Sequence, residues 1–573
     1  MDDLYITTSI PYVNGSPHLG HALELVHVDV LARHRRLRGA HVRVQSGTDD
    51  HALKNVSAAS VAGVPVADLV AANGDRFVDL VDALGVRTDE FVRTSSDPRH
   101  APGVVALWEA CRAAGDLYQK DYTALYCPGC EQFYAADELV DGLCTEHRSP
   151  VQEVTETNWF FRLSRYRDQV AALVASGEVA VEPRQRRNEV LGFLAGEVHD
   201  ISVSRPADRA GGWGVPVPGD PGQVVYVWFD ALVNYLTGLG YGSETDRCGA
   251  VGREGDAVHG GCEAGGAGGA GSAGSAGSAG GAGSAGGAGS AGDEGDEGGA
   301  GDEGGEGGEG GDVSVGVGVG VEEPFARWWG GGAERTHVLG KGIARFHAVY
   351  WVAFLLSAGL PLPTRVLVHD YLTVDGAKIA KSGSQAADPA TVVATYGSDA
   401  LRWWLVRAPA TVGTTDFTVE RLVGCHDSDL ANGLGNLVSR TLTLARRDRT
   451  WSVQPAAAVG VEIREAARAL PDGVDTALAR YDLRSACETI TGLVEQGNRF
   501  IEGEAPWQLA RAADAGDLES AARFEGVVDA LVELCRLAAH ELEPFVPEGA
   551  ARLTEQLDAG VGRPVPVFPR IGG

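Results

Sequence analysis

The order of hydrophobic and polar positions divides the chain into an α/β part and a helical part. β-branched apolar runs predict strands at residues 4–8, 42–51, 336–343 and 366–371. A stripe of leucine and valine at helical spacing predicts a helix over residues 22–38. Strands separated by helices indicate an α/β fold with a parallel sheet, and ligands bind at the carboxyl ends of such strands.

The last third of the chain follows a different period. From residue 395 to about 557, apolar residues recur at i, i+3 and i+4 between short loops, which predicts a helix bundle. Before it, two stretches interrupt the sheet. Short, turn-rich segments from about residue 118 indicate an insertion, after which we expect the sheet to resume at residues 224–235.

The second interruption, residues 242–321, contains Gly, Ala and Ser, then Asp-Glu-Gly repeats. It lacks the apolar content that would offset the entropy of ordering, so we expect it to be disordered. It is either a tolerated loop expansion or a segment that binds a partner.

Composition limits the class of protein. The 573 residues suffice for several domains, and the formal charge of 48 − 78 = −30 argues against a surface generally coated with nucleic acid. A local basic patch remains compatible with this charge. No apolar run is long enough to span a bilayer and the first residues lack a signal region, so we expect a cytoplasmic protein without a membrane partner. Nine scattered cysteines with one tight cluster suit a reducing compartment and a metal site.

Two histidines follow the first strand. His18 and His21 lie three residues apart at the N-terminus of the predicted helix, where backbone N–H groups and the helix dipole favour a phosphate. Gly20 between them lets a nucleotide approach the backbone. The pattern indicates an ATP site, although many helices begin with a histidine that has no such role.

The cysteine cluster has the spacing of a zinc site. Cys127 and Cys130 form one pair, and Cys144 and His147 form the second. Two such pairs complete a tetrahedral shell without an open position, so we expect one structural Zn²⁺ per chain. The alternative is a chance grouping of buried cysteines.

A lysine-bearing hairpin follows the last predicted strand. Asp375-Gly376 is a strong hairpin turn signal, and Lys378 and Lys381 come directly after it. Two ammonium groups on a loop can neutralise a pyrophosphate leaving group as its charge grows. A solvated lysine hairpin is the simpler interpretation of the same residues.

These motifs together resemble a known family. Pro17-His18-Leu19-Gly20-His21 resembles the HIGH signature of class I aminoacyl-tRNA synthetases, and residues 6–21 resemble the methionyl branch. Residues 378–382, Lys-Ile-Ala-Lys-Ser, resemble the second signature of these enzymes, KMSKS. The resemblance covers nearly everything outside the acidic tract. It implies a class I Rossmann-type parallel sheet, a one-knuckle zinc insertion and a C-terminal anticodon-binding helix bundle.

The resemblance also implies roles for individual residues. His18, His21, Lys378 and Lys381 are the expected catalytic residues, and ATP with Mg²⁺ is expected at His18, Gly20, His21, Gly340, Lys378, Lys381 and Ser382. Asp49, which on pattern alone is equally a helix N-cap, is expected to hold the α-amino group of methionine. The pocket for the methionine side chain is expected at Ser9, Ile10, Tyr12, Trp228, Ala231, Leu232, Tyr235, Phe346 and His347. Asn436, Arg440 and Trp507 are expected to read the anticodon of tRNA(Met).

These assignments give the expected domain order. Residues 1–117 form the first half of the catalytic domain, 118–213 the zinc insertion and 214–362 the second half, interrupted by the tract at 242–321. Residues 363–400 form a stem-contact region with the lysine loop, and 401–573 form the anticodon-binding bundle. Since the chain ends soon after the bundle, we expect a monomer.

The chain departs from the family pattern at four positions near the expected active site: Ala52, Gly342, Asp370 and Ala380. The expected reaction is activation of L-methionine by ATP, followed by transfer to tRNA(Met). Three alternatives remain: a second copy altered in response to an inhibitor, an enzyme that activates an amino acid for delivery to a small-molecule amine, and a non-catalytic tRNA-binding relative.

Overall fold

The computed structural model describes residues 3–127, 132–134, 139–145, 148–242, 324–378, 388–559 and 565–572. Nearly all of the glycine-rich tract, including the whole of its acidic part, lies outside these ranges, so its disorder stays a prediction. Among the residues described, no single helix has both the length and the apolar character to cross a membrane; α2 (Leu53–Ala62) and α3 (Val66–Ala83) pass that test only as a pair bent by 104°.

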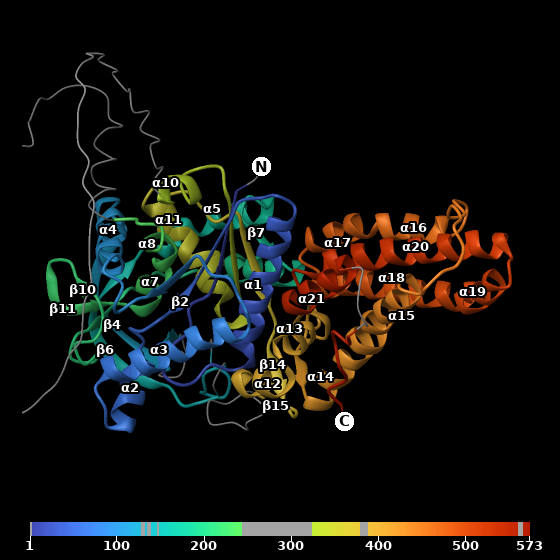
Figure 1. Cartoon of the computed structure of the whole chain (residues 1–573). Coiled ribbons are helices and arrows are strands. Elements are labelled where there is room, and N and C mark those ends of the chain that lie inside the picture. The colour runs from blue at the N-terminus through green and yellow to red at the C-terminus, as the bar shows by residue number, and fades with distance from the viewer. Residues whose placement is uncertain are drawn as a thin grey trace, which may run out of the picture. The chain divides into compact units, whose positions relative to one another are not determined.

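A parallel sheet of six strands carries the first part of the fold (Figure 1). Its order is β3 (Glu90–Arg93), β2 (Val42–Thr48), β1 (Leu4–Thr8), β12 (Glu334–Gly340), β13 (Arg365–His369) and β7 (Ala180–Glu182). The predicted strands and the parallel α/β class are therefore confirmed. The strand order reverses between β1 and β12, whose registers place Leu4 beside Glu334 and Thr8 beside Val338. A ligand is expected outside the carboxyl ends of the strands at this reversal.

Both faces of the sheet are buried. Leu4 and Ile6 of β1 pack in the core that contains α1 (Leu19–Leu37), whereas Tyr5 packs in a second core with α4 (His100–Ala113) and α11 (Val352–Ser357). Alternating side chains of one strand thus serve opposite faces, which explains why these strands are nearly continuously apolar.

The insertion contains a second, antiparallel sheet. Its order is β5 (Gln132–Tyr134), β4 (Leu117–Cys127), β6 (Gln152–Phe161) and β8 (Ile201–Ser202). Helices α5 (Leu163–Ser176) and α6 (Arg184–Ala195) flank β7, which returns to the edge of the main sheet.

One strand expectation was wrong. The main sheet does not resume at residues 224–235, because β11 (Asp220–Val225) belongs to a small sheet with β9 (Ser204–Pro206) and β10 (Pro216–Val217). The residues after it form α7 (Val227–Leu232) and α8 (Asn234–Thr237). A buried apolar run of this length does not distinguish a strand from a helix.

After β12 the chain forms a 3₁₀ turn, η2 (Lys341–Ile343), and a π-helical segment, η3 (Phe346–Trp351), that leads into α11. The hairpin β14 (Leu372–Val374) and β15 (Ala377–Lys378) turns at Asp375 and Gly376, whose φ angles are 51° and 76°. These positive values confirm the predicted turn. A strand that the sequence pattern did not predict, β16 (Thr415–Phe417), pairs in parallel with β14 inside the region expected to be helical.

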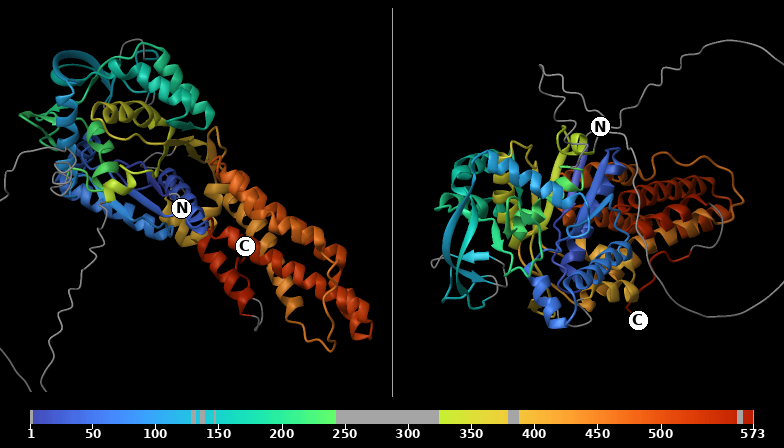
Figure 2. Two further views of the ribbon diagram at one scale, coloured as in Figure 1. Left: turned by 90° about the horizontal axis from the view of Figure 1, so that it is seen from above. Right: turned by 90° about the vertical axis from the view of Figure 1, so that its left-hand side faces the viewer.

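The C-terminal part is a helix bundle, as predicted, and its orange and red helices pack side by side in Figures 1 and 2. Its elements are α12 (Pro389–Tyr396), α13 (Ser398–Arg407), α14 (Val419–Cys425), the π-helical η5 (His426–Gly435), α15 (Asn436–Ala445), α16 (Val461–Arg468), α17 (Leu470–Leu478), α18 (Leu483–Glu504), α19 (Pro506–Asp514), α20 (Leu518–Leu542) and α21 (Pro547–Asp558). The core that contains α1 continues into this bundle.

Candidate functional site

The N-terminus of α1 is capped by the two histidines that the sequence analysis singled out. His18 is the N-cap residue, and its Nδ1 accepts a hydrogen bond from the backbone N–H of Gly20 at 3.1 Å. The Nδ1 of His21 accepts from the backbone N–H of His18 at 3.0 Å. The rings stack with their centroids 3.7 Å apart. Because both Nδ1 atoms accept, a neutral ring at either position carries its proton on Nε2.

Glycine at position 20 is required by this cap. A Cβ at Gly20 would lie 2.9 Å from Cε1 of His18, so a side chain there would displace the ring. The histidines and the glycine are thus one unit: the imidazoles occupy the place of an ordinary Ser or Asp cap and add ring donors beside the helix dipole.

A buried carboxylate, which the sequence analysis missed, ties this helix to two strands. Glu24 Oε1 accepts from the backbone N–H of Ser9 at 2.6 Å and from its hydroxyl at 2.7 Å, and Oε2 lies 3.1 Å from Nε2 of His369. Burial by itself lowers the pKa of His369, but the contacts with Glu24 outweigh it and the pKa is raised. Glu24 therefore joins the carboxyl ends of β1 and β13 beneath the histidine pair. In the sequence, Glu24 is marked only as a charged residue within the apolar stripe of the helix, three residues after His21.

Ile10, Tyr12 and Asp49 meet at the carboxyl ends of β1 and β2. The backbone N–H of Asp49 donates to the carbonyl of Pro11 at 2.9 Å, and Tyr12 forms a parallel bridge with Asp49. A Cβ at Gly47 would collide with the carbonyl of Val92 and lie 3.1 Å from the side chain of Ile10. The glycine before the buried Asp49 carboxylate thus allows this close packing.

Asp50 and Ala52, the second of which departs from the family pattern, lie nearby and leave the backbone ordinary. Asp50 accepts a hydrogen bond from the hydroxyl of Ser95 at 2.6 Å. Ala52 has φ −62° as the N-cap of α2, so this position does not need glycine. Its side chain is fully buried in a cluster with Tyr226 and Val227.

Aromatic rings from three segments gather beside Asp49. Trp228 of α7 stacks on Phe346 of η3 with centroids 3.9 Å apart and planes 9° apart. Tyr12 lies 6.1 Å from Trp228 at a tilt of 57°. Ala231 and Leu232 follow on α7 and are buried. The structure thus brings together the rings expected to line the side-chain pocket.

Tyr235 and His347 form the polar end of this group. The Tyr235 hydroxyl lies 2.8 Å from Nε2 of His347, and Nδ1 of His347 lies 3.0 Å from the carbonyl of Ile343. Burial lowers the pKa of His347 to about 4, so the ring is neutral at pH 7. Nδ1–H then donates to the carbonyl and Nε2 accepts from the tyrosine.

A second buried carboxylate that was not predicted from the sequence holds α7 in place. Asp230 is buried, with His51 Nδ1 at 2.6 Å and His100 Nε2 at 2.7 Å from its carboxylate oxygens. Burial by itself would raise the pKa of Asp230, but the two histidines hold it well below its usual range. These contacts link α7 to α4 and to the start of α2. In the sequence, the indication of these contacts is an aspartate inside an apolar run.

The ends of β12 and β13 carry an ion cluster. Asp370 accepts two hydrogen bonds from Arg186 at 2.7 Å and lies 3.0 Å from Nζ of Lys341, and the backbone N–H of Gly413 donates to it at 2.7 Å. Gly340 ends β12, and a Cβ there would lie 3.5 Å from the ring of His369. Lys378 ends the described hairpin, while Ala380, Lys381 and Ser382 lie outside the described residues.

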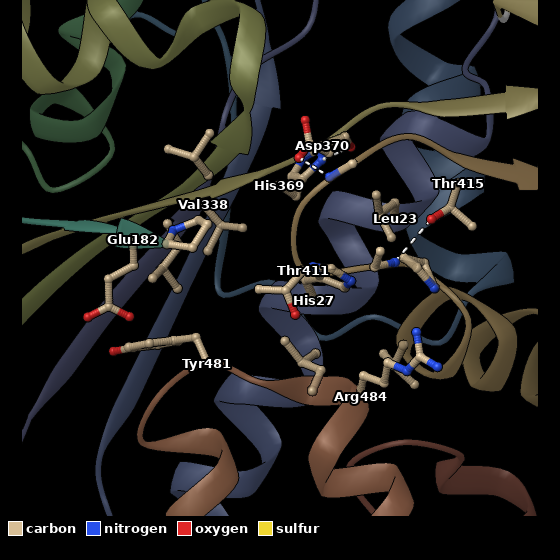
Figure 3. Close-up of a pocket in the computed structure, with 18 of the residues that line it drawn as sticks. Leu23, His27, Glu182, Val338, His369, Asp370, Thr411, Thr415, Tyr481 and Arg484 are labelled. Carbon is tan, nitrogen blue, oxygen red and sulfur yellow. Dashed lines mark hydrogen bonds between the residues drawn. The ribbon is translucent and has the colours of Figure 1, made fainter. Parts of the chain in front are cut away.

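A pocket that opens to solvent runs from this cluster along α1 (Figure 3). His369 and Asp370 lie at one end, and Tyr481 and Arg484 lie at the other. Burial lowers the pKa of His27 in its wall to about 3, so the ring is neutral, and its Nε2 lies 3.2 Å from the carbonyl of Leu405. Within the part of the chain that the structure describes, none of the site residues predicted from the sequence lines this pocket.

The expected anticodon residues lie in the bundle. Asn436 begins α15 and is exposed, and Arg440 one turn later lies 3.8 Å from Glu502, five residues before Trp507. Trp507 is 42% exposed at the start of α19. In the same bundle, Arg447 and Arg449 pair with Asp514 and Glu525 at 2.6 Å, so their charges are largely neutralised.

Two of the four expected zinc ligands are described. Cys127 ends β4, and it shares one buried cluster with Cys144. Ser149 lies 3.6 Å from Sγ of Cys127, and the backbone carbonyl of Ser149 accepts from the N–H of Cys144. Paired buried thiols on a short ribbon suit Zn²⁺. Cys130 and His147 lie outside the described residues.

A Rossmann-type sheet with an anion-binding helix N-terminus at its switch point defines a mononucleotide-binding catalytic domain. Comparison with known proteins specifies the class. The family model described as "tRNA synthetases class I (M)" matches residues 4–156, 146–249 and 314–442.

Full-length relatives agree. The methionine–tRNA ligase of Brucella suis is 33% identical over 565 residues, covering 96% of this chain and 91% of the relative, and that of Mycobacterium bovis is 33% identical with coverage of 97% and 92%. The solved structure of Mycobacterium tuberculosis methionyl-tRNA synthetase in complex with methionyl-adenylate has a TM-score of 0.79 at 32% identity, covering both chains completely. The chain belongs to the methionyl family of class I tRNA synthetases.

The Glu24 to His369 contact predicts a pH-dependent stability. A raised pKa means that the charged pair stabilises the fold fully below about pH 6.5, and that this contribution is lost as pH rises through the higher folded pKa. Glu24→Gln should lower the free energy of unfolding by roughly 1–3 kcal/mol near pH 6 and by less at pH 8. Urea unfolding across this range measures the difference.

NMR titration of His369 should show its pKa falling below 6.5 in the same variant. Glu197→Gln, which alters a carboxylate whose side chain is 84% exposed, is the control and should leave stability within about 0.5 kcal/mol. A difference between wild type and Glu24→Gln that does not change with pH would contradict the charge pairing.

Proposed function

We propose that the chain is a methionine–tRNA ligase that activates L-methionine with ATP and transfers the methionyl group to tRNA(Met). The observation that carries this proposal is the set of groups that follow neighbouring strands at the switch point: the imidazole cap of α1 follows β1, Asp49 follows β2, and Phe346, which stacks on Trp228, follows β12. A polyphosphate, an ammonium group and an apolar side chain each have a complementary partner there.

The substrate groups follow from this chemistry. The Asp49 carboxylate would hold the α-amino group of methionine, and the thioether would pack against the rings of Tyr12, Trp228 and Phe346, since sulfur packs well on aromatic rings. The neutral Tyr235 and His347 pair adds a polar end without a net charge. A pocket of this kind discriminates a methyl group by only about 1–3 kcal/mol, so norleucine and homocysteine should also be activated.

Adenylate formation is a displacement at phosphorus. The methionine carboxylate attacks the α-phosphorus of ATP, a new C–O–P linkage forms, and the bond to the bridging oxygen breaks to release pyrophosphate. The Nε2–H groups of His18 and His21 would donate to phosphate oxygens as charge shifts, and Lys378 and Lys381 would neutralise the leaving group. Mg²⁺ would enter with ATP and neutralise phosphate charge. The terminal ribose hydroxyl of tRNA then attacks the adenylate carbonyl, and AMP leaves.

The first prediction concerns the activation step. The protein should catalyse methionine-dependent exchange of pyrophosphate into ATP, and Lys381→Ala should slow this exchange by about 10²-fold or more, because charge stabilisation at the leaving group is lost. Lys120→Ala removes an ammonium group that lies over Phe160 in the insertion, and it should leave exchange unchanged.

A panel of amino acids in this assay separates the alternatives. Exchange with another amino acid but not methionine would support the enzyme that delivers an adenylate to an amine. Absence of exchange with every amino acid would support the non-catalytic tRNA-binding relative. Normal exchange that resists an inhibitor of the methionine site would support the altered second copy.

The second prediction concerns tRNA. Trp507 is exposed at a helix start, five residues after Glu502, the partner of Arg440, and an exposed ring is what a stacking platform for a splayed base requires. Trp507→Ala should weaken tRNA(Met) charging by roughly 10–100-fold, which corresponds to a loss of about 1–3 kcal/mol of stacking, with exchange unchanged. Leu518→Ala, at a residue 63% exposed elsewhere in the bundle, is the control. Equal charging by the two variants would remove Trp507 from the interface.

We further propose that Cys127, Cys130, Cys144 and His147 hold one structural Zn²⁺, and that the enzyme is a monomer. Cys127→Ala or Cys144→Ala should abolish the one zinc per chain measured by elemental analysis and lower the melting temperature. Cys425→Ala is the matched control, because burial raises the pKa of that thiol to about 12 and keeps it protonated. Full zinc content in both ligand variants would refute the site.

A further inference from the structure

The turn that follows β12 has no room for a side chain at position 342. Gly342 lies in η2, directly after the strand end that borders the switch point, and its backbone is exposed. A Cβ built on Gly342 would overlap the hydroxyl oxygen of Tyr371 and lie 3.5 Å from Cζ of the same ring. The Tyr371 hydroxyl therefore occupies the volume in which any side chain at position 342 would begin.

Tyr371 is held in this place by its neighbours. Nζ of Lys341 lies 4.7 Å from the centre of its ring, and the same ammonium group lies 3.0 Å from Asp370. The carbonyl of Tyr371 accepts a hydrogen bond from the backbone N–H of Thr415 at 3.2 Å. Contacts on the ring and on the backbone thus fix the position of the hydroxyl beside η2.

The neighbouring carboxylate does not take this role. Asp370 binds Arg186, Lys341 and the backbone N–H of Gly413, and its side chain is only 3% exposed. Figure 3 shows it beside His369 at the end of the pocket. Burial by itself raises the pKa of Asp370, but these three contacts outweigh it and keep the group ionised. A carboxylate engaged in this way anchors the turn and does not serve as an acceptor for substrate.

We propose that the Tyr371 hydroxyl is the protein group that contacts a ribose hydroxyl of ATP at the end of β12, and that Gly342 is required to make room for it. This inference rests on the proposed function. A phenol is both a donor and an acceptor and is neutral at pH 7, whereas a carboxylate at position 342 would accept only and would add a charge. The chain therefore contacts the sugar through a neutral group. The position of the Tyr371 hydroxyl depends on glycine at position 342, so the two residues are coupled.

The test measures binding and exchange with ATP, 2′-deoxy-ATP and 3′-deoxy-ATP. Wild type should favour ATP over one of the two deoxy analogues by roughly five- to tenfold, the size expected for one hydrogen bond. Tyr371→Phe should bind ATP only as well as wild type binds that analogue. The variant should no longer distinguish ATP from the analogue. Tyr481→Phe, which removes a hydroxyl bound to Glu334 at 2.9 Å, is the control and should discriminate as wild type does.

Gly342→Ala tests the coupling. Alone, it should weaken ATP at least as much as Tyr371→Phe, because the new methyl group displaces the hydroxyl. In the double variant the methyl group meets only the ring at an ordinary distance, so the two effects should not add. Gly332→Ala, where a Cβ meets nothing within 4 Å, is the matched control.

The outcomes are separable. Tyr371→Phe that keeps the wild-type preference for ATP over both deoxy analogues, or additive effects of the two substitutions, would overturn the inference. If wild type catalyses no methionine-dependent exchange of pyrophosphate, the proposed function is overturned instead. If wild type exchanges pyrophosphate normally but does not distinguish ATP from either deoxy analogue, the inference alone is overturned.

Discussion

The anchoring of α1 is the constraint on which the rest of the structure depends. At its N-terminus the two imidazoles cap the helix, and Glu24 one turn later binds the ends of β1 and β13. In its middle, Asp29 is buried between Arg33 and Arg402, both at 2.7 Å. A helix fixed at several points holds its histidine-capped end still relative to the sheet, and fixed groups of this kind are what electrostatic stabilisation of a transition state requires.

The same helix joins the catalytic sheet to the bundle. Arg402 of α13 donates to the carbonyls of Pro544 and Phe545 as well as to Asp29, and Arg38 binds Glu541 of α20 at 2.7 Å. Burial of such charges is costly unless every group is paired, so these contacts favour one relative placement of α1 and the bundle helices over its alternatives. The bundle thus has a direct structural connection to the helix that carries the histidine cap.

The departures from the family pattern are accommodated locally. Ala52 takes an ordinary helix-entry conformation and fills a buried cluster, so the glycine it replaces is not needed. Gly342 and Asp370 are linked through Lys341, which contacts both Asp370 and the ring of Tyr371. Altered residues that compensate one another in this way fit a working site with a modified nucleotide contact better than a decayed one.

The sequence by itself determined four strands of the main sheet, the first helix, the hairpin turn at Asp375 and the family, because periodicity and short motifs are local properties. It also named the residues that meet at the switch point. Only the tertiary structure decided which distant groups meet: the Glu24 bridge to His369 and the Asp230 contacts with two histidines. A buried charge requires a partner. That partner comes from a segment up to hundreds of residues away, which packing brings close and which no local pattern in the sequence indicates.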